Sequence, residues 1–159
     1  MSDASFHDVD PGPLNLRAEG AEDISVLSML VQDAVLTGTD LSFDRRRRQL
    51  ALLINRFRWE DAEAAASEGR DYERVRAVLL ISDITGLRSD GIQRDDPDEV
   101  LSLLALSWQP GEDGTGQLSL EFAGDGTIVA DVECIAVDLR DVTRPYIANS
   151  GQMPRHDEA

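Results

Sequence analysis

The chain has 159 residues, of which 42% are hydrophobic and 29% charged, which fits one globular domain with a substantial core. Its formal net charge is −16, and all basic residues are arginine because the sequence contains no lysine. The resulting negative field opposes contact with nucleic acid and anionic lipid. No apolar run reaches the roughly 20 residues that a membrane helix needs. The N-terminus lacks the basic and apolar regions of a signal peptide, so we expect a cytoplasmic protein.

The predicted single domain occupies residues 13–147. A leader at 1–12 and a tail at 148–159 are polar and poor in apolar residues, and we expect both to be loose. Alternation of Leu14 and Leu16 with polar neighbours predicts a short strand at the start of the domain.

The clearest helix is predicted over residues 21–34. Glu22 and Asp23 fall in its first turn, where the helix dipole favours acidic side chains. Apolar residues then recur at spacings of three and four, at Ile24, Leu27, Val31 and Ala34. This pattern indicates one apolar stripe that packs on a sheet.

The middle of the chain reads mainly as strands. Residues 35–43 and 49–57 are predicted as two strands, and residues 74–85, apolar on both faces, as a central strand. The polar, alanine-rich residues 59–73 are interpreted as a mobile loop, with one helical turn as an alternative. The glycines that follow the central strand, Gly86 and Gly91, mark a turn.

The second half is predicted to be strand-rich as well. A strand is favoured over 100–109, with a helix as the alternative because an Asp-Pro-Asp-Glu start signal precedes it. Strands on either side of the glycine-rich turn 123–126 form a hairpin. The apolar positions then change face within 133–142, which a β-bulge or a short helix would explain.

Together these elements predict an α+β fold. Short connections favour antiparallel pairing, so we expect a strongly bent, mostly antiparallel sheet with one main helix over one face. A sandwich and a partly closed barrel both fit, and a pleckstrin-homology-like (PH-like) arrangement is one form of the latter.

The sequence offers little of the usual catalytic chemistry. The only histidines, His7 and His156, lie in the predicted loose ends, and Cys134 is the only cysteine, interpreted as a strand filler. No phosphate-binding or dinucleotide-binding glycine motif and no HExxH motif is present. We therefore predict no catalytic residue, no metal site and no cofactor.

The sharpest local anomaly is a run of four arginines, residues 45–48, in a strongly acidic protein. At a hairpin tip such a run could bind phosphate or carboxylate groups, or it could be a solvated end paired with nearby acids. Asp83 interrupts an apolar run and needs a partner if buried, for which Arg56, Arg58 and Arg76 are candidates. The candidate binding residues are Arg45, Arg46, Arg47, Arg48, Arg56, Arg58, Trp59 and Asp83.

Several longer strings resemble one protein family. They are LVQDAVL (30–36), LLINRFRWE (52–60), GIQR (91–94), LSLLALSWQPGE (101–112) and LEFAGDGTIVADVECI (120–135). The chain is similar over residues 13–145 to the proteobacterial "domain of unknown function 2948" family. The resemblance implies a small stand-alone protein, chiefly of alphaproteobacteria, and carries over no catalytic residue.

Three functional hypotheses follow. The leading one is a non-catalytic binding or adaptor protein, with a protein partner or a second copy of the chain as its target. The second is contact of the 45–48 hairpin with RNA or another polyanion, which the overall charge disfavours. The third is an enzyme built from carboxylates and arginines, with Asp83 as its candidate group. None of them involves a membrane.

Overall fold

The computed structural model describes residues 12–93 and 96–147. The leader predicted over 1–12, apart from its last residue, and the tail predicted over 148–159 lie outside the described residues, as do both histidines. The helices are α1 (Ala21–Val31), α2 (Ala62–Glu68) and the 3-10 turns η1 (Gly38–Asp40) and η2 (Trp59–Asp61).

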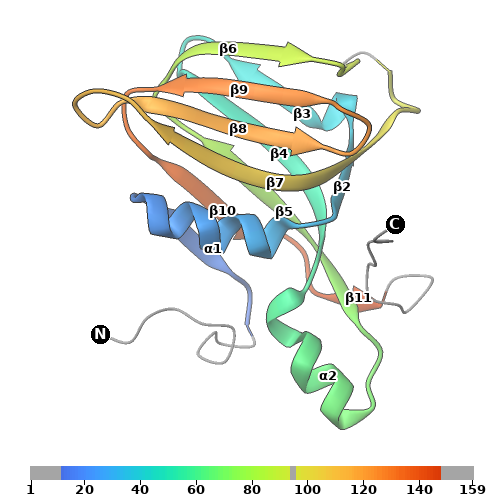
Figure 1. Cartoon of the computed structure of the whole chain (residues 1–159). Helices are drawn as coiled ribbons and strands as arrows, with labels where there is room; N and C mark the ends of the chain where they lie inside the picture. Colours follow the sequence, from blue (N-terminus) through green and yellow to red (C-terminus); the bar gives the residue numbers. More distant parts are fainter. Residues whose placement is uncertain (1–11, 94–95, 148–159) are drawn as a thin grey trace.

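The described residues form one antiparallel sheet of eleven strands (Figure 1). The main path runs β1-β10-β5-β4-β2-β7-β8-β9-β6, while β3 pairs with β4 and β11 pairs with β5. The strands are β1 (Asn15–Ala18), β2 (Ala34–Thr37), β3 (Leu41–Asp44), β4 (Gln49–Phe57), β5 (Glu73–Ile81), β6 (Ile84–Asp90), β7 (Val100–Pro110), β8 (Gly116–Phe122), β9 (Thr127–Val132), β10 (Val137–Asp141) and β11 (Tyr146–Ile147).

The sheet bends around a single hydrophobic core, but it does not close on itself. Alternate residues of its strands point inward, as Leu50, Leu52 and Ile54 of β4 do. Helix α1 lies across β7 and buries its apolar stripe in the same core (Figure 1). The mostly antiparallel, bent α+β sheet predicted from the sequence is therefore confirmed.

The predicted helix is shorter than its apolar periodicity suggested. It ends at Val31, and Asp33 adopts φ 64°, a left-handed conformation in which Asp is one of the few tolerated residues. The chain reverses there, and Ala34, the last residue of the apolar pattern, begins β2. The predicted strand 35–43 is likewise interrupted, because η1 separates β2 from β3.

Residues 59–73 hold more regular structure than a loop. They form η2 and then the seven-residue helix α2, which projects from the end of β4 (Figure 1). Its sequence is rich in alanine, the best helix former, and Gly69 at φ 67° ends it. Interpreting this segment as a loop with one helical turn was wrong, because its helix propensity outweighs the weak apolar pattern.

The predicted central strand 74–85 is two strands that meet at a corner. β5 ends at Ile81, Asp83 takes φ 58°, and β6 starts at Ile84. Gly86, predicted to mark a turn, therefore lies inside β6, whereas Gly91 at φ 71° does turn the chain.

The apolar positions change face within 133–142 because the chain bends there, beside the corner at Asp83. β9 and β10 are separate strands, and β10 pairs with β5 and β1, so the segment is neither one bulged strand nor a helix. Backbone hydrogen bonds from Ser82 to Ala136 (2.9 Å) and from Glu133 to Asp83 (3.0 Å) join the two bends. The paired ribbons β5–β10 and β6–β9 thus turn this corner together, which bends the sheet.

The other predictions for the second half agree with the structure. The favoured strand over 100–109 is β7, and the hairpin around 123–126 joins β8 to β9. No helix among the described residues has the length and apolar content needed to cross a membrane.

Candidate binding site

The two groups of candidate arginines lie at opposite ends of strand β4. The arginine turn, residues 45–48, precedes the strand on the side of β6, whereas Arg56 and Arg58 end it beside α2 (Figure 1). A nine-residue strand at about 3.3 Å per residue separates them by roughly 25 Å. The sequence-based candidates therefore form two separate clusters.

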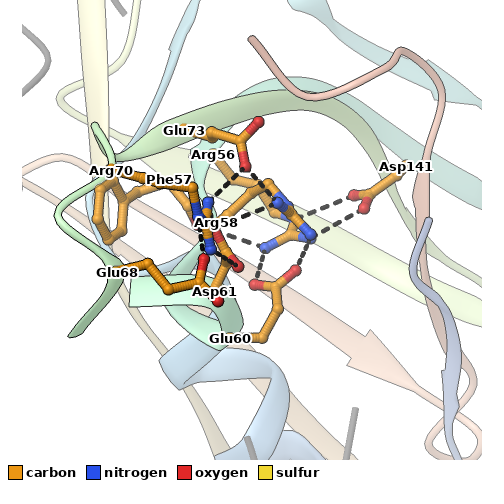
Figure 2. A network of polar contacts seen from close by, with 9 residues as sticks. All are labelled: Arg56, Phe57, Arg58, Glu60, Asp61, Glu68, Arg70, Glu73 and Asp141. Carbon is orange, nitrogen blue, oxygen red and sulfur yellow. Dashed lines mark hydrogen bonds and ion pairs between the residues drawn. The ribbon is translucent and has the colours of Figure 1, made fainter. Parts of the chain in front are cut away.

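Arg56 is the centre of a buried ion-pair network (Figure 2). It continues the inward-facing positions of β4, so its side chain is fully buried. Its guanidinium donates to Asp141 through Nε (3.0 Å) and Nη2 (2.9 Å), and to Glu60 through Nη1 (2.8 Å) and Nη2 (2.6 Å). The Nη1 atom also reaches the carbonyl oxygen of Phe57 at 3.3 Å.

Both carboxylates of this network are as inaccessible as the arginine. The side chains of Glu60 and Asp141 are 3% and 2% exposed. Burial alone would lower the pKa of Arg56, but the hydrogen bonds and charges of the two carboxylates outweigh it and raise that pKa. All of the donor groups of Arg56 are thus engaged by buried partners, which makes the Arg56 network a structural element.

A second layer of ion pairs continues toward α2 (Figure 2). Arg58 donates to Glu73 at 2.7 Å and lies 3.5 Å from Asp61, and Arg70 donates to both oxygens of Asp61 and to Glu68. Burial would raise the pKa of Asp61, but the hydrogen bond from Arg70 and the two arginine charges hold it below its ordinary value. These contacts attach η2 and α2 to the strands.

Trp59 belongs to this structural cluster too. Its indole N–H donates to the carbonyl oxygen of Gln32 at 2.9 Å, and its ring meets Phe57 edge-on with centroids 4.6 Å apart. Both its polar and its apolar surface are therefore used within the fold.

The arginine turn is held in place by its own neighbours. The carboxylate of Asp44 accepts the backbone N–H groups of Arg46 (3.0 Å) and Arg47 (3.1 Å), which is a local turn motif. Arg48 has φ 55° and donates from Nη1 to Glu133 at 2.7 Å, while its Nη2 lies 3.9 Å from Asp83. The hydrogen bond to Glu133 is the main cause of the raised pKa of Arg48.

Asp83, for which the sequence left a buried and an exposed position open, lies in the corner between β5 and β6 with its side chain 40% exposed. Its ion-pair partner is Arg48, whereas Arg56 is occupied at the far end of β4. The thiol of Cys134 donates to the carboxylate of Asp83 at 3.3 Å. This hydrogen bond is the main cause of the raised pKa of the Cys134 thiol.

A solvent-open cleft of about 580 Å³ lies where the arginine turn meets β6. The volume is in the range typical of small-ligand pockets. We call it the seam cleft, because it lies along β6, the last strand of the unclosed sheet. Its described lining residues are Phe43, Arg45, Arg48, Ile84, Thr85, Gly86 and Leu87.

The cleft combines positive charge with apolar surface. Phe43 and Leu87 are partly buried and pack on the core, whereas Arg45 has no ion pair with any residue in the described part of the chain. The backbone N–H of Ile84 donates to the carbonyl of Arg48 at 3.1 Å, which joins two of the lining residues. None of the described lining residues is a carboxylate, histidine or cysteine.

The sequence pointed to part of this site. Arg45, Arg48 and Asp83 come together here, whereas Arg46 and Arg47 lie in the turn outside the lining. Phe43 and residues 84–87 were not foreseen, although a glycine inside an apolar strand can signal close approach of another backbone. Within residues 12–93 and 96–147, no group of three or more His, Cys, Asp or Glu side chains could hold a metal ion.

Fold and cleft together define a small α+β protein built on one open, bent antiparallel sheet. The chain belongs to the family described as "Protein of unknown function (DUF2948)", whose model matches residues 14–156. No curated protein and no solved structure matches the chain, so the PH-like arrangement stays a prediction.

Proposed function

We propose that this protein is a non-catalytic binding module whose ligand site is the seam cleft. The observation that carries the proposal is the guanidinium of Arg45, which has no ion pair among the described residues, beside the apolar side chains of Phe43 and Leu87 in a cleft of about 580 Å³. Such a surface suits a ligand with one anionic group and an apolar portion.

The composition of the cleft favours binding over catalysis. General acid–base and nucleophilic mechanisms need a titratable or nucleophilic group within reach of the substrate, and the described lining offers only arginines and a threonine hydroxyl. Cys134 and Asp83 are neighbours of the site, but the carboxylate raises the thiol pKa and so lowers its nucleophilicity at neutral pH.

Contact with RNA through all four arginines has less support. Arg47 lies 3.9 Å from Asp44 and Arg48 is bonded to Glu133, so two of the four positive charges have acidic neighbours. RNA contact would also depend on Arg46 as much as on Arg45, because phosphate attraction is not confined to a cleft.

An NMR titration tests the proposal. The isotope-labelled full chain is titrated with a panel of aliphatic and aromatic carboxylates and phosphates, up to about 10 mM so that millimolar affinities are detected. We expect amide shifts that cluster at Phe43 and residues 84–87 and disappear in Arg45→Ala.

Arg46→Ala is the matched control, since it removes the same charge from the same turn outside the cleft lining. It should preserve the shifts. Shifts that are scattered, that disappear equally in both variants, or that no panel member produces at the cleft would contradict the proposal.

A further inference from the structure

We propose that the seam cleft binds the extended C-terminal segment of another protein, which pairs antiparallel with β6 and places its terminal carboxylate on Arg45. This inference rests on the proposed function and adds to it the class of ligand and the direction in which it lies.

The first support is the free edge of β6. This strand pairs with β9 on one side and is the last in the strand order, so no strand in the described part of the chain covers its other side. Pairing is irregular between Ile84 and Gly86 and regular from Gly86 to Asp90. An extended peptide can add to such an edge through main-chain hydrogen bonds.

The second support is that the cleft extends along this edge. Ile84, Thr85, Gly86 and Leu87 are consecutive residues of β6, and all of them line the cleft. A Cβ at Gly86 would come within 3.0 Å of the Asp131 carboxylate on the paired strand β9, so the close contact that favours glycine here lies on the side away from the free edge. An added strand would place alternate side chains inward, where Phe43 and Leu87 offer apolar surface.

The third support is the position of the arginines relative to the direction of β6. The strand starts at Ile84, whose N–H is bonded to Arg48, and it runs away from the arginine turn. A peptide antiparallel to β6 therefore ends at that turn with its carboxyl terminus. A parallel peptide would place its positively charged amino terminus there instead.

Charge selects between these two directions and supplies specificity. Arg48 is already bonded to Glu133, whereas Arg45 has no ion pair among the described residues, so Arg45 is the group available to a carboxylate. In a protein of net charge −16, this turn is a local positive site. An arginine can hold a carboxylate through two parallel hydrogen bonds.

The experiment uses two synthetic pools of random short peptides that differ only at the C-terminus, one with free carboxylates and one with amides. Each pool is passed over the immobilised full chain, and the enriched peptides are sequenced and remade singly. We expect enrichment from the free-acid pool, and affinity at least about tenfold weaker for the amide form of each selected peptide, because a charge-assisted hydrogen bond is lost.

Two further measurements identify the binding mode. Methylating alternate backbone nitrogens of a selected peptide should abolish binding, since it removes the main-chain donors while keeping the side chains. Hydrogen exchange of the complex should show slower exchange within residues 84–90. Arg45→Ala should weaken binding about tenfold or more, whereas Arg46→Ala should leave it within about twofold.

The outcomes distinguish a failure of the strand-pairing inference from a failure of the proposed function. If small carboxylates bind at the cleft but the free-acid and amide pools enrich equally, or if methylated peptides bind as well, the strand-pairing inference fails and the proposed function stands. If neither small anions nor peptides reach the cleft, both fail. Dimerisation that protects residues 84–90 and excludes the peptides would overturn the inference in favour of a second copy of the chain.

Discussion

The two ends of strand β4 use the same residue type for opposite purposes. At one end Arg56 is fully buried and bonded to two buried carboxylates, so its charge is neutralised inside the fold. At the other end Arg45 lines an open cleft without an ion pair in the described part of the chain. Burial and the number of engaged donors, rather than the presence of arginine, separate a structural group from an available one.

The largest expected effect comes from breaking the buried end. Arg56→Ala leaves two carboxylates buried without their counter-charge, so we expect a loss of about 3–5 kcal/mol in the free energy of unfolding. Arg56→Lys should recover only part of this, because an ammonium cannot donate to both carboxylates with the arginine geometry. Urea denaturation followed by circular dichroism measures both.

The control for this measurement is Arg76→Ala, which removes an exposed arginine from the neighbouring strand β5. It should change the unfolding free energy by no more than about 0.5 kcal/mol. Equal effects of the Arg56 and Arg76 substitutions would mean that the Arg56 network contributes nothing beyond a surface charge.

A smaller effect is expected in the layer around Asp61, and it should depend on pH. Its folded-state pKa lies below the ordinary value of 3.8, so its ion pairs stabilise the fold above that pH and are lost as pH falls through the folded-state pKa. Asp61→Asn should therefore cost about 1 kcal/mol at neutral pH and progressively less below pH 3.8.

Stability measured across an acidic pH series tests this expectation. A cost of Asp61→Asn that stays constant from neutral to strongly acidic pH would contradict the electrostatic explanation. Asp71→Asn, the same acid-to-amide change at an exposed position between α2 and β5, controls for a general change in net charge.

At the end of β4 beside the cleft, we expect substitutions to change the reactivity of the Cys134 thiol rather than the stability of the fold. The hydrogen bond from the Cys134 thiol to the Asp83 carboxylate raises the thiol pKa, so the thiol should react slowly with iodoacetamide at neutral pH. Asp83→Asn should accelerate alkylation severalfold. Asparagine tolerates the left-handed conformation of this position, so the backbone should be preserved.

The rate of alkylation is followed by mass spectrometry of the intact protein. Glu133→Gln is the comparison, because it removes a nearby negative charge without removing the hydrogen-bond acceptor of the thiol. An alkylation rate that changes as much in this variant as in Asp83→Asn would show that charge, rather than the hydrogen bond, sets the thiol pKa.

The smallest effect is expected for Arg45→Ala on stability. Since Arg45 has no ion pair with any described residue, its removal should change the unfolding free energy by less than about 0.5 kcal/mol. Thermal unfolding measures this. A loss of more than about 1 kcal/mol would place Arg45 with Arg56 among the structural arginines and remove the contrast between the two ends.

Features of the fold that depend on a local pattern of residues could be predicted from the sequence. Strand β4 has the predicted bounds, 49–57, because its period-two alternation is unbroken. The same alternation places Arg56 on the inward face after Leu50, Leu52 and Ile54. Its burial could therefore have been foreseen, but Asp141 is 85 positions away in the chain and no local signal marks it as the partner.

The cleft could not be predicted for a related reason. It depends on the corner at Asp83, where β5 ends and β6 begins, and both strands are apolar there, so the run looks continuous. The corner rests on backbone hydrogen bonds to residues 133 and 136, roughly fifty positions further along. Arg45 and Arg48 were identified as candidates, whereas the apolar wall beside them required the three-dimensional arrangement.

The edge of β6, which no other strand of the described residues covers, also bears on the tendency of the protein to associate in solution. An exposed strand edge is a template on which identical molecules can stack, and natural proteins protect such edges with charge. Here the protection is global, because two molecules that each carry a net charge of −16 repel one another before their edges meet. Ionic strength sets the range of that repulsion, so we expect concentrated solutions of this unclosed sheet to associate more readily as the salt concentration rises.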